Sequence, residues 1–128
     1  MNKPLIAIPI GDPAGVGPEI VAMALADSKV AEAARCIIVG DRKIMEQAVK
    51  ITGAEVRVNV VKEPEEGIYE PGVLNLIDLD NIDMDQFEFG KVSGMCGKAA
   101  YEYIAESIRL ANEGKADAVA TTPINKEA

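Results

Sequence analysis

Residues 11–19 form the stretch GDPAGVGPE, the first part of the sequence whose residue types could do chemistry. Glycines let the backbone approach a ligand closely, and backbone amides at the start of a helix attract anions such as phosphate or carboxylate. Asp12 adds a carboxylate that could hold or move a proton. The stretch therefore predicts an anion site whose backbone contacts are three glycines: Gly11, Gly15 and Gly17.

A second such stretch, TTPINK, occupies residues 121–126. Its threonine hydroxyls, amide side chain and ammonium group could together hold a phosphate or a carboxylate. A lysine whose pKa is lowered by burial could also carry a proton. We therefore expect Thr122 and Asn125 to bind substrate or cofactor, and Lys126, followed by Asp12, to act in catalysis.

Each of these residues also has a purely structural interpretation, which the sequence leaves open. Glycine and proline are common in any strand-to-helix turn, and Asp12 could cap that turn. Lys126 could be a solvated side chain on a first helical turn. The glycines of residues 11–19 match neither nucleotide-binding motif, GxxxxGK[ST] or GxGxxG. The acidic stretch 78–90 matches no calcium loop, and we interpret it as solvated surface rather than as a metal site.

The composition excludes several classes of function. The 128 residues contain no histidine, which excludes a Ser-His-Asp triad and a zinc site with histidine ligands within this chain. A net charge of −8 without a cluster of Lys or Arg argues against nucleic acid or an anionic membrane as partner. No apolar run approaches the length of a membrane span, and no secretion signal is evident, so we expect a cytoplasmic protein. We expect Cys36 and Cys96 to be reduced and buried.

Apolar runs alternate with helical patterns along the chain. The strand-like runs are residues 5–10, 36–39, 55–61, 73–77 and 118–122. The helical patterns are residues 18–27, 29–35, 42–52 and 93–113. The last helix is expected to bury one apolar stripe: Ala100, Tyr103, Ile104, Ile108 and Ala111. This alternation predicts an α/β domain with a mostly parallel sheet.

The predicted sheet would position both candidate stretches. Ligands bind beyond the carboxyl ends of parallel strands, and residues 11–19 and 121–127 each follow a strand, so both stretches would lie at one edge. Asp41 and Gly53 are expected to cap the helix between them. A further helical start at Pro123, close to the last residue, suggests that the printed chain stops in mid-fold.

Five motifs occur in a fixed order: GDPAGVGPE, GDR at 40–42, EPGVLNLID at 70–78, GKVSGMCGKAAYEYI at 90–104 and DAVATTPINKEA at 117–128. Together they resemble the N-terminal part of the 4-hydroxythreonine-4-phosphate dehydrogenase family of pyridoxal phosphate biosynthesis. The resemblance implies a three-layer α/β/α fold like that of isocitrate and isopropylmalate dehydrogenases. It also implies a homodimer that uses NAD and a divalent metal to oxidise 4-phosphohydroxy-L-threonine, with loss of CO₂ to give 3-amino-2-oxopropyl phosphate.

The resemblance also implies which parts of the family's site this chain lacks. The family's metal (zinc, magnesium or cobalt) is held by three histidines, and a Gly-His-Thr-Glu motif touches the substrate; all of these would lie beyond residue 128. Residues 1–128 would be the N-terminal segment of a larger two-lobed enzyme, without an internal boundary and inactive alone. Two alternatives stay open: a related dehydrogenase of 4-phospho-D-threonate or 4-phosphoerythronate, and a non-catalytic α/β module that binds a small anion.

Overall fold

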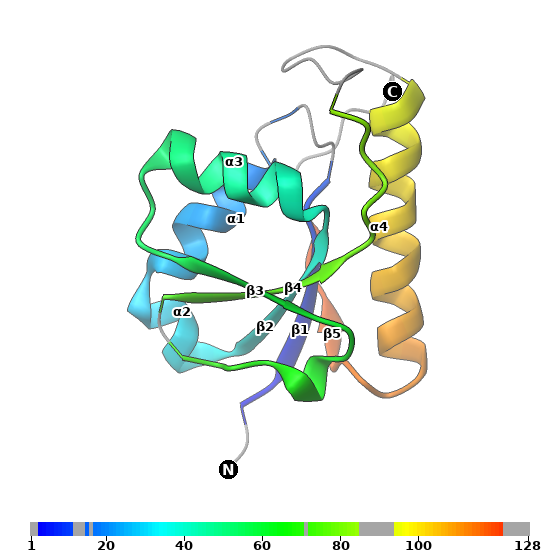
Figure 1. Ribbon diagram of the computed structural model, residues 1–128. Coiled ribbons are helices and arrows are strands. Elements are labelled where there is room, and N and C mark those ends of the chain that lie inside the picture. The colour runs from blue at the N-terminus through cyan, green and yellow to red at the C-terminus, as the bar shows by residue number, and fades with distance from the viewer. Residues whose placement is uncertain (1–2, 12–14, 16, 71, 85–93, 122–128) are drawn as a thin grey trace.

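A parallel five-stranded sheet forms the centre of the molecule, in the strand order β3-β4-β2-β1-β5 (Figure 1). The computed structural model describes residues 3–11, 15, 17–70, 72–84 and 94–121. The strands are β1 Leu5–Pro9, β2 Arg35–Gly40, β3 Arg57–Val61, β4 Val73–Asp78 and β5 Ala118–Val119. The α/β class and the parallel sheet that the sequence predicts are therefore confirmed. The predicted last strand, 118–122, is shorter than expected, and the predicted helical start at Pro123 lies outside the described residues.

Helices cover both faces of this sheet and make a three-layer α/β/α arrangement (Figure 1). The first three helices pack on one face: α1 Gly17–Ala26, α2 Ser28–Ala33 and α3 Arg42–Thr52. The long helix α4, Gly94–Asn112, packs on the other face over β1, β2 and β5. A short 3-10 helix η1, Pro64–Glu66, lies in the connection between β3 and β4.

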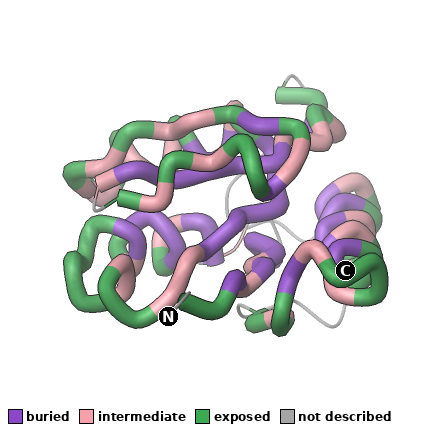
Figure 2. Tube along the Cα trace, turned by 90° about the horizontal axis from the view of Figure 1, so that it is seen from below, coloured by how far each residue is buried: buried purple, intermediate pink, exposed green. Residues whose placement is uncertain are grey.

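The central strands carry the hydrophobic core, which the view in Figure 2 shows as continuous buried segments. Ile37, Ile38 and Val39 of β2 are fully buried, because helices cover the strand on both faces. β4 is buried in the same way from Val73 to Ile77. Cys36 and Cys96 are buried and form no disulfide, as the sequence predicts.

The described residues between β3 and β4 form no α-helix, and a buried asparagine holds this connection to the sheet. The side-chain amide of Asn75 donates to the carbonyl of Ile68 (2.8 Å), and its oxygen accepts from the Ile68 amide (2.9 Å). The same oxygen accepts from the Asn59 side chain of β3 (2.9 Å). Because these bonds satisfy Asn75, its almost complete burial carries no unpaired polar cost.

The last described strand pairs with the first. Leu5 and Asp117 are 112 residues apart, yet the Asp117 amide donates to the Leu5 carbonyl (2.7 Å) and the Leu5 amide donates to the Asp117 carboxylate (2.8 Å). Parallel pairing continues from Ile6 opposite Ala118. The ends of the described chain are thereby joined at the amino edge of the sheet.

The helix caps agree with the sequence, but the buried face of α4 does not. Asp41 caps α3 at its start, and Gly53 ends it in the left-handed region (φ 67°), as predicted. The predicted stripe on α4 is partly wrong, because Ile108 is 47% exposed and Ile104 is only half-buried. The side chains that α4 buries are Cys96, Ala99, Ala100, Tyr103, Ser107 and Leu110. The helix carries two apolar stripes, and the sheet covers one of them.

A helix that crosses a membrane must be both long and apolar. Among the described residues, no helix combines the length and the apolarity needed to cross a bilayer.

Gly40 gives a direct test of how tightly the ends of β1 and β2 approach each other. A Cβ at Gly40 would lie 2.7 to 3.0 Å from three side-chain carbons of Ile10, which is fully buried and cannot move aside. We expect Gly40→Ala to lower the free energy of unfolding by about 1–3 kcal/mol, measured by urea denaturation. Adding Ile10→Val, which removes the nearest carbon, should recover part of this loss.

Gly94→Ala is the matched control, because among the described residues no heavy atom outside its chain neighbours and its own helix backbone lies within 4 Å of the added Cβ. We expect this variant to unfold within about 1 kcal/mol of the original chain. Equal losses at Gly40 and Gly94 would show that general glycine effects, and not the contact with Ile10, decide the outcome.

Candidate functional site

The carboxyl edge of the sheet is where the sequence predicts the functional site. Gly11 follows β1, is buried, and has φ 77°, a conformation that favours glycine. Gly15 is half-buried, and Gly17 is buried as the first residue of α1. The predicted stretch therefore leads from β1 into a helix N-terminus, the geometry that the anion-site hypothesis requires.

The second predicted stretch begins beside the first. β5 lies next to β1 and parallel to it, and the Ala120 amide donates to the Ala7 carbonyl (3.0 Å). Thr121 follows at the same edge of the sheet and is exposed. The fold thus brings the starts of both stretches to neighbouring positions. Four predicted site residues lie outside the described residues: Asp12, Thr122, Asn125 and Lys126.

A buried carboxylate organises the adjoining part of this edge. Asp41 is fully buried; one oxygen accepts from the Lys43 amide at the start of α3 (2.8 Å), and the other accepts from the Ile82 amide (3.1 Å). The Lys43 ammonium lies 3.4 Å from the second oxygen. The cap was evident from the sequence, because Asp41 follows an apolar strand and precedes a helical pattern. The bond to Ile82 was not, because it joins residues 41 positions apart.

Asp78 repeats this arrangement at the end of the neighbouring strand β4. One of its oxygens accepts from the Arg42 amide (3.0 Å) and from the Asp80 amide (2.9 Å). Asp80 has a positive φ of 47° and pairs with the Lys43 ammonium at 2.5 Å. The hydrogen bond to Asp80 is the largest cause that raises the pKa of Lys43 above its usual value. The segment after β4 is therefore fastened to the start of α3 by charge-assisted hydrogen bonds.

The same three carboxylates have the spacing of a possible cation site. Asp41, Asp78 and Asp80 each offer an oxygen, and these oxygens lie within 4.8 Å of one another. However, the Lys43 ammonium and several backbone amides already neutralise or bond to these groups. We therefore assign the cluster a structural role.

Tyr103 connects α4 to this network. Its ring is fully buried beneath the sheet, and its hydroxyl donates to the Asn81 side-chain oxygen (2.7 Å). Burial raises the pKa of the Tyr103 hydroxyl, so the donor stays protonated over the physiological range. The start of α3, the end of β4 with the residues after it, and α4 thus form one connected carboxyl edge.

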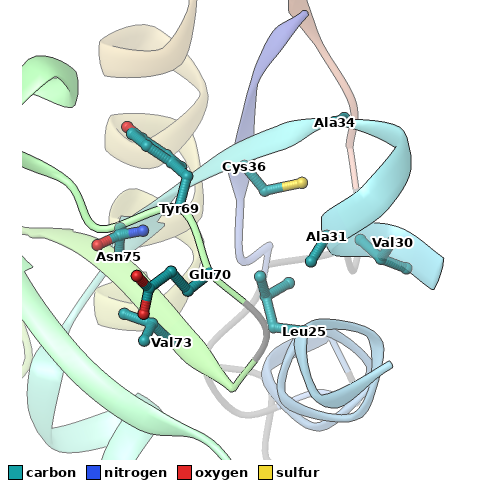
Figure 3. Close-up of a pocket in the computed structure, with 9 residues that line it drawn as sticks. All are labelled: Leu25, Val30, Ala31, Ala34, Cys36, Tyr69, Glu70, Val73 and Asn75. Atoms are coloured by element: carbon teal, nitrogen blue, oxygen red, sulfur yellow. The ribbon is translucent and has the colours of Figure 1, made fainter. Parts of the chain in front are cut away.

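A small cavity lies at the opposite, amino edge of the sheet (Figure 3). Its volume of about 20 Å³ suits one water molecule and is far below that of a substrate pocket. The lining residues are Leu25, Val30, Ala31, Ala34, Cys36, Tyr69, Glu70, Val73 and Asn75. This cavity is therefore not the predicted functional site.

The comparisons with known proteins decide the family. A family model described as "Pyridoxal phosphate biosynthetic protein PdxA" matches residues 32–128, which is more than half of the chain. The chain belongs to the PdxA family.

Individual PdxA relatives agree with this. A Fusobacterium nucleatum protein named as a D-threonate 4-phosphate dehydrogenase is 52% identical over 122 residues, which are 95% of this chain and 37% of that protein. A crystal structure of a 4-hydroxythreonine-4-phosphate dehydrogenase from Burkholderia phymatum superposes with a TM-score of 0.94 at 41% identity, over 99% of this chain and 38% of that one. The corresponding Klebsiella pneumoniae structure gives 0.89 at 33% identity, over 98% and 38%. The chain spans less than two fifths of the length of these relatives.

Asp41 allows a test of the carboxyl-edge network. Asp41→Ala removes the acceptor for two backbone amides and leaves the Ile82 amide buried without a partner. We expect a loss of about 2–4 kcal/mol in the free energy of unfolding. Asp27→Ala is the control, because Asp27 caps α2 in the same way on the exposed surface, and its loss should cost about 1 kcal/mol. Equal losses would contradict the role of the second oxygen of Asp41.

Tyr69 gives a prediction on pH dependence. Its hydroxyl donates to the Pro64 carbonyl (2.5 Å), and burial raises its pKa from 10 to about 12. Between these values the unfolded chain releases the proton while the native state keeps it, so the stability falls as the pH rises. We expect Tyr69→Phe to make this decline shallower in urea titrations between pH 10 and pH 12. An unchanged slope would show that Tyr69 does not contribute.

Proposed function

We propose that this chain forms part of an NAD-dependent dehydrogenase that oxidises a hydroxyl group of a 4-phosphorylated hydroxy acid. The observation that carries this proposal is family membership, and the neighbouring positions of β1 and β5, after which the two predicted stretches begin, support it. Oxidation of the alcohol to a ketone removes a hydride, which NAD would accept, and a proton, which a base must take. A β-keto acid formed in this way would then lose CO₂.

The relatives favour 4-phospho-D-threonate as the substrate. Two of the relatives reported above are named for different substrates. The relative at 52% identity is named for D-threonate 4-phosphate, and the solved structure at 41% identity is named for 4-hydroxythreonine 4-phosphate. The second candidate substrate is therefore 4-phosphohydroxy-L-threonine, which the family description supports through pyridoxal phosphate biosynthesis. Both molecules present a phosphate, a carboxylate and a hydroxyl to be oxidised.

Within this chain, the two stretches at the carboxyl edge are the proposed contacts. Gly11 after β1 and Gly17 at the start of α1 are both buried, which supports a site where backbone amides bind an anionic group. We propose that Thr122, Asn125 and Lys126 hold the phosphate or carboxylate from the other side. In this arrangement, Lys126 or Asp12 would hold the proton that leaves the hydroxyl. We also propose that Gly15 contacts the substrate or the cofactor.

The divalent metal of the family finds no fitting ligand set among the described residues of this chain. The sequence has no histidine, and the carboxylates nearest one another at this edge already bond to Lys43 and to backbone amides. We derive no step through a metal here and propose that its ligands come from other parts of the full-length family protein. The larger protein would be a two-lobed cytoplasmic homodimer, with this chain as an undivided N-terminal segment and with no nucleic acid or membrane partner.

Grafting tests the substrate proposal. This chain would replace the aligned part of the Fusobacterium nucleatum relative and, separately, of the Burkholderia phymatum enzyme. Each graft would be supplied with NAD, a divalent metal and either substrate, and NADH would be followed by absorbance. We expect both grafts to prefer 4-phospho-D-threonate, and the isolated chain to form no NADH. Failure of both grafts to form NADH from either substrate, while their parents remain active, would overturn the proposal.

Lys126 has a sharper test within the same grafts. We expect Lys126→Ala to lower kcat/KM by about 10²-fold or more, since a proton carrier and an anion contact are lost together. Lys50→Ala on the exposed end of α3 is the control and should leave kcat/KM unchanged. A Lys126→Ala graft with unaltered kinetics would show that this lysine is a solvated surface residue.

A further inference from the structure

Gly40 ends β2 at the carboxyl edge of the sheet and is the first residue of the GDR motif. It lies opposite Ile10, because the parallel register of β1 and β2 pairs Pro9 with Val39 one position earlier. The Ile10 amide continues this pairing and donates to the Val39 carbonyl (3.0 Å). Gly40 therefore faces the last residue before the predicted anion site, which begins at Gly11.

Glycine is required at position 40 for space and not for backbone conformation. Gly40 has no positive φ, so alanine can adopt its backbone angles. A Cβ, however, would lie 2.7 Å from Cδ1, 2.9 Å from Cγ2 and 3.0 Å from Cγ1 of Ile10. Ile10 is fully buried and fills the space that a side chain at Gly40 would take. The two residues thus form one packing unit at the ends of β1 and β2.

The backbone of Gly40 is held in place from the side of β4. Its carbonyl accepts from the Leu79 amide (2.9 Å). The next residue, Asp41, is fully buried, and its carboxylate accepts from the Ile82 amide (3.1 Å). Because β2 is fastened on this side, a side chain added at Gly40 would displace Ile10 rather than the end of β2.

A displacement of Ile10 reaches the anion site directly. The next residue, Gly11, is buried and has the left-handed φ of 77° with which the chain leaves β1. A rigid peptide unit joins the two residues, so a displaced Ile10 moves the Gly11 amide as well. Charge-assisted hydrogen bonds to an anion need distances of about 2.7–2.9 Å, so a small movement of the backbone weakens them.

We propose that Gly40 is a positioning residue for the anion site: it leaves the space into which Ile10 packs, and Ile10 in turn sets the place of Gly11. The proposal deepens the function proposed above and rests on it. Backbone amides bind the oxygens of a phosphate, a carboxylate or a pyrophosphate alike, so either the phosphorylated hydroxy acid or NAD can supply the anionic group.

Two substitutions that exchange one methyl group test this role. Gly40→Ala adds a carbon where Ile10→Val removes the nearest one, so the double variant keeps the packed volume unchanged. Both single variants and the double variant would be made in the graft on the Fusobacterium nucleatum relative, as a double-mutant cycle. Calorimetry would measure the Kd of 4-phospho-D-threonate and, separately, the Kd of NAD, which distinguishes the two sources of the anion.

We expect the ligand that occupies the site to bind about 10-fold more weakly to the Gly40→Ala graft, which corresponds to the loss of one charge-assisted hydrogen bond. Ile10→Val alone should weaken the same ligand about 3-fold, because the smaller side chain holds Gly11 less firmly. The double variant should bind within about 2-fold of the original graft, since the two volume changes cancel. In turnover, KM for that ligand should rise by the same factors, with kcat changed by less than about 2-fold.

Val73→Ala is the matched control, because Val73 is a buried apolar residue at the start of β4, at the amino edge of the sheet. It also disturbs the packing of a central strand, so it should lower Tm as Gly40→Ala does. Its Kd for both ligands should equal that of the original graft.

The role of Gly40 is refuted if the Gly40→Ala graft binds both ligands as tightly as the original graft, or if Val73→Ala weakens them equally. A double variant that binds no better than Gly40→Ala would show that the contact with Ile10 is not the cause. If Gly40→Ala does not fold, the double variant must bind more tightly than Ile10→Val alone, and the opposite order overturns the proposal. A graft that binds neither ligand also overturns it.

The binding measurement needs no turnover, which separates this role from the proposed function. A graft that binds either ligand and shows the expected cycle, yet forms no NADH, contradicts the proposed dehydrogenase and supports the positioning role of Gly40.

Discussion

The carboxylate of Asp41 is the point at which separate parts of the carboxyl edge become one structure. A carboxylate without partners would be strongly unfavourable at full burial, so the group must have hydrogen-bond donors around it. The Lys43 amide at the start of α3 and the Ile82 amide beyond β4 supply these donors, and the Lys43 ammonium adds a charge. The consequence is that the direction of α3 and the path of the chain after β4 are set together.

This edge adjoins the place where we expect the chemistry to occur. β1 and β5 are neighbours, so the stretches that follow them leave the sheet side by side. The membership in the PdxA family and the geometry of Gly11 support the same interpretation from independent directions. By contrast, the small cavity beside Tyr69 lies between α1, α2 and the amino ends of β2 and β4, and it is only large enough for one water molecule.

The sequence predicted the elements well because their signals are local. A wholly apolar run identified β2, and a short run that is apolar except for Asn75 identified β4. The positions of Asp41 and Gly53 just outside a helical pattern identified them as caps. Two features could not be predicted from local signals. The bond from Asp41 to Ile82 depends on which strands are neighbours, and the buried side of α4 depends on which of two apolar stripes meets the sheet. The roles of Asp12, Thr122, Asn125 and Lys126 remain predictions, since they lie outside the described residues.

The pairing of Leu5 with Asp117 has a consequence for biosynthesis. β1 is made before both of its partner strands, and its edge toward β5 waits longer, because Leu5 and Asp117 are 112 residues apart. At ordinary rates of translation this interval is on the order of ten seconds. During that time one side of an apolar strand has no partner within the nascent chain, and a parallel sheet offers no hairpin to shorten the wait. The exposure of this edge of β1 therefore ends only once β5 has been made.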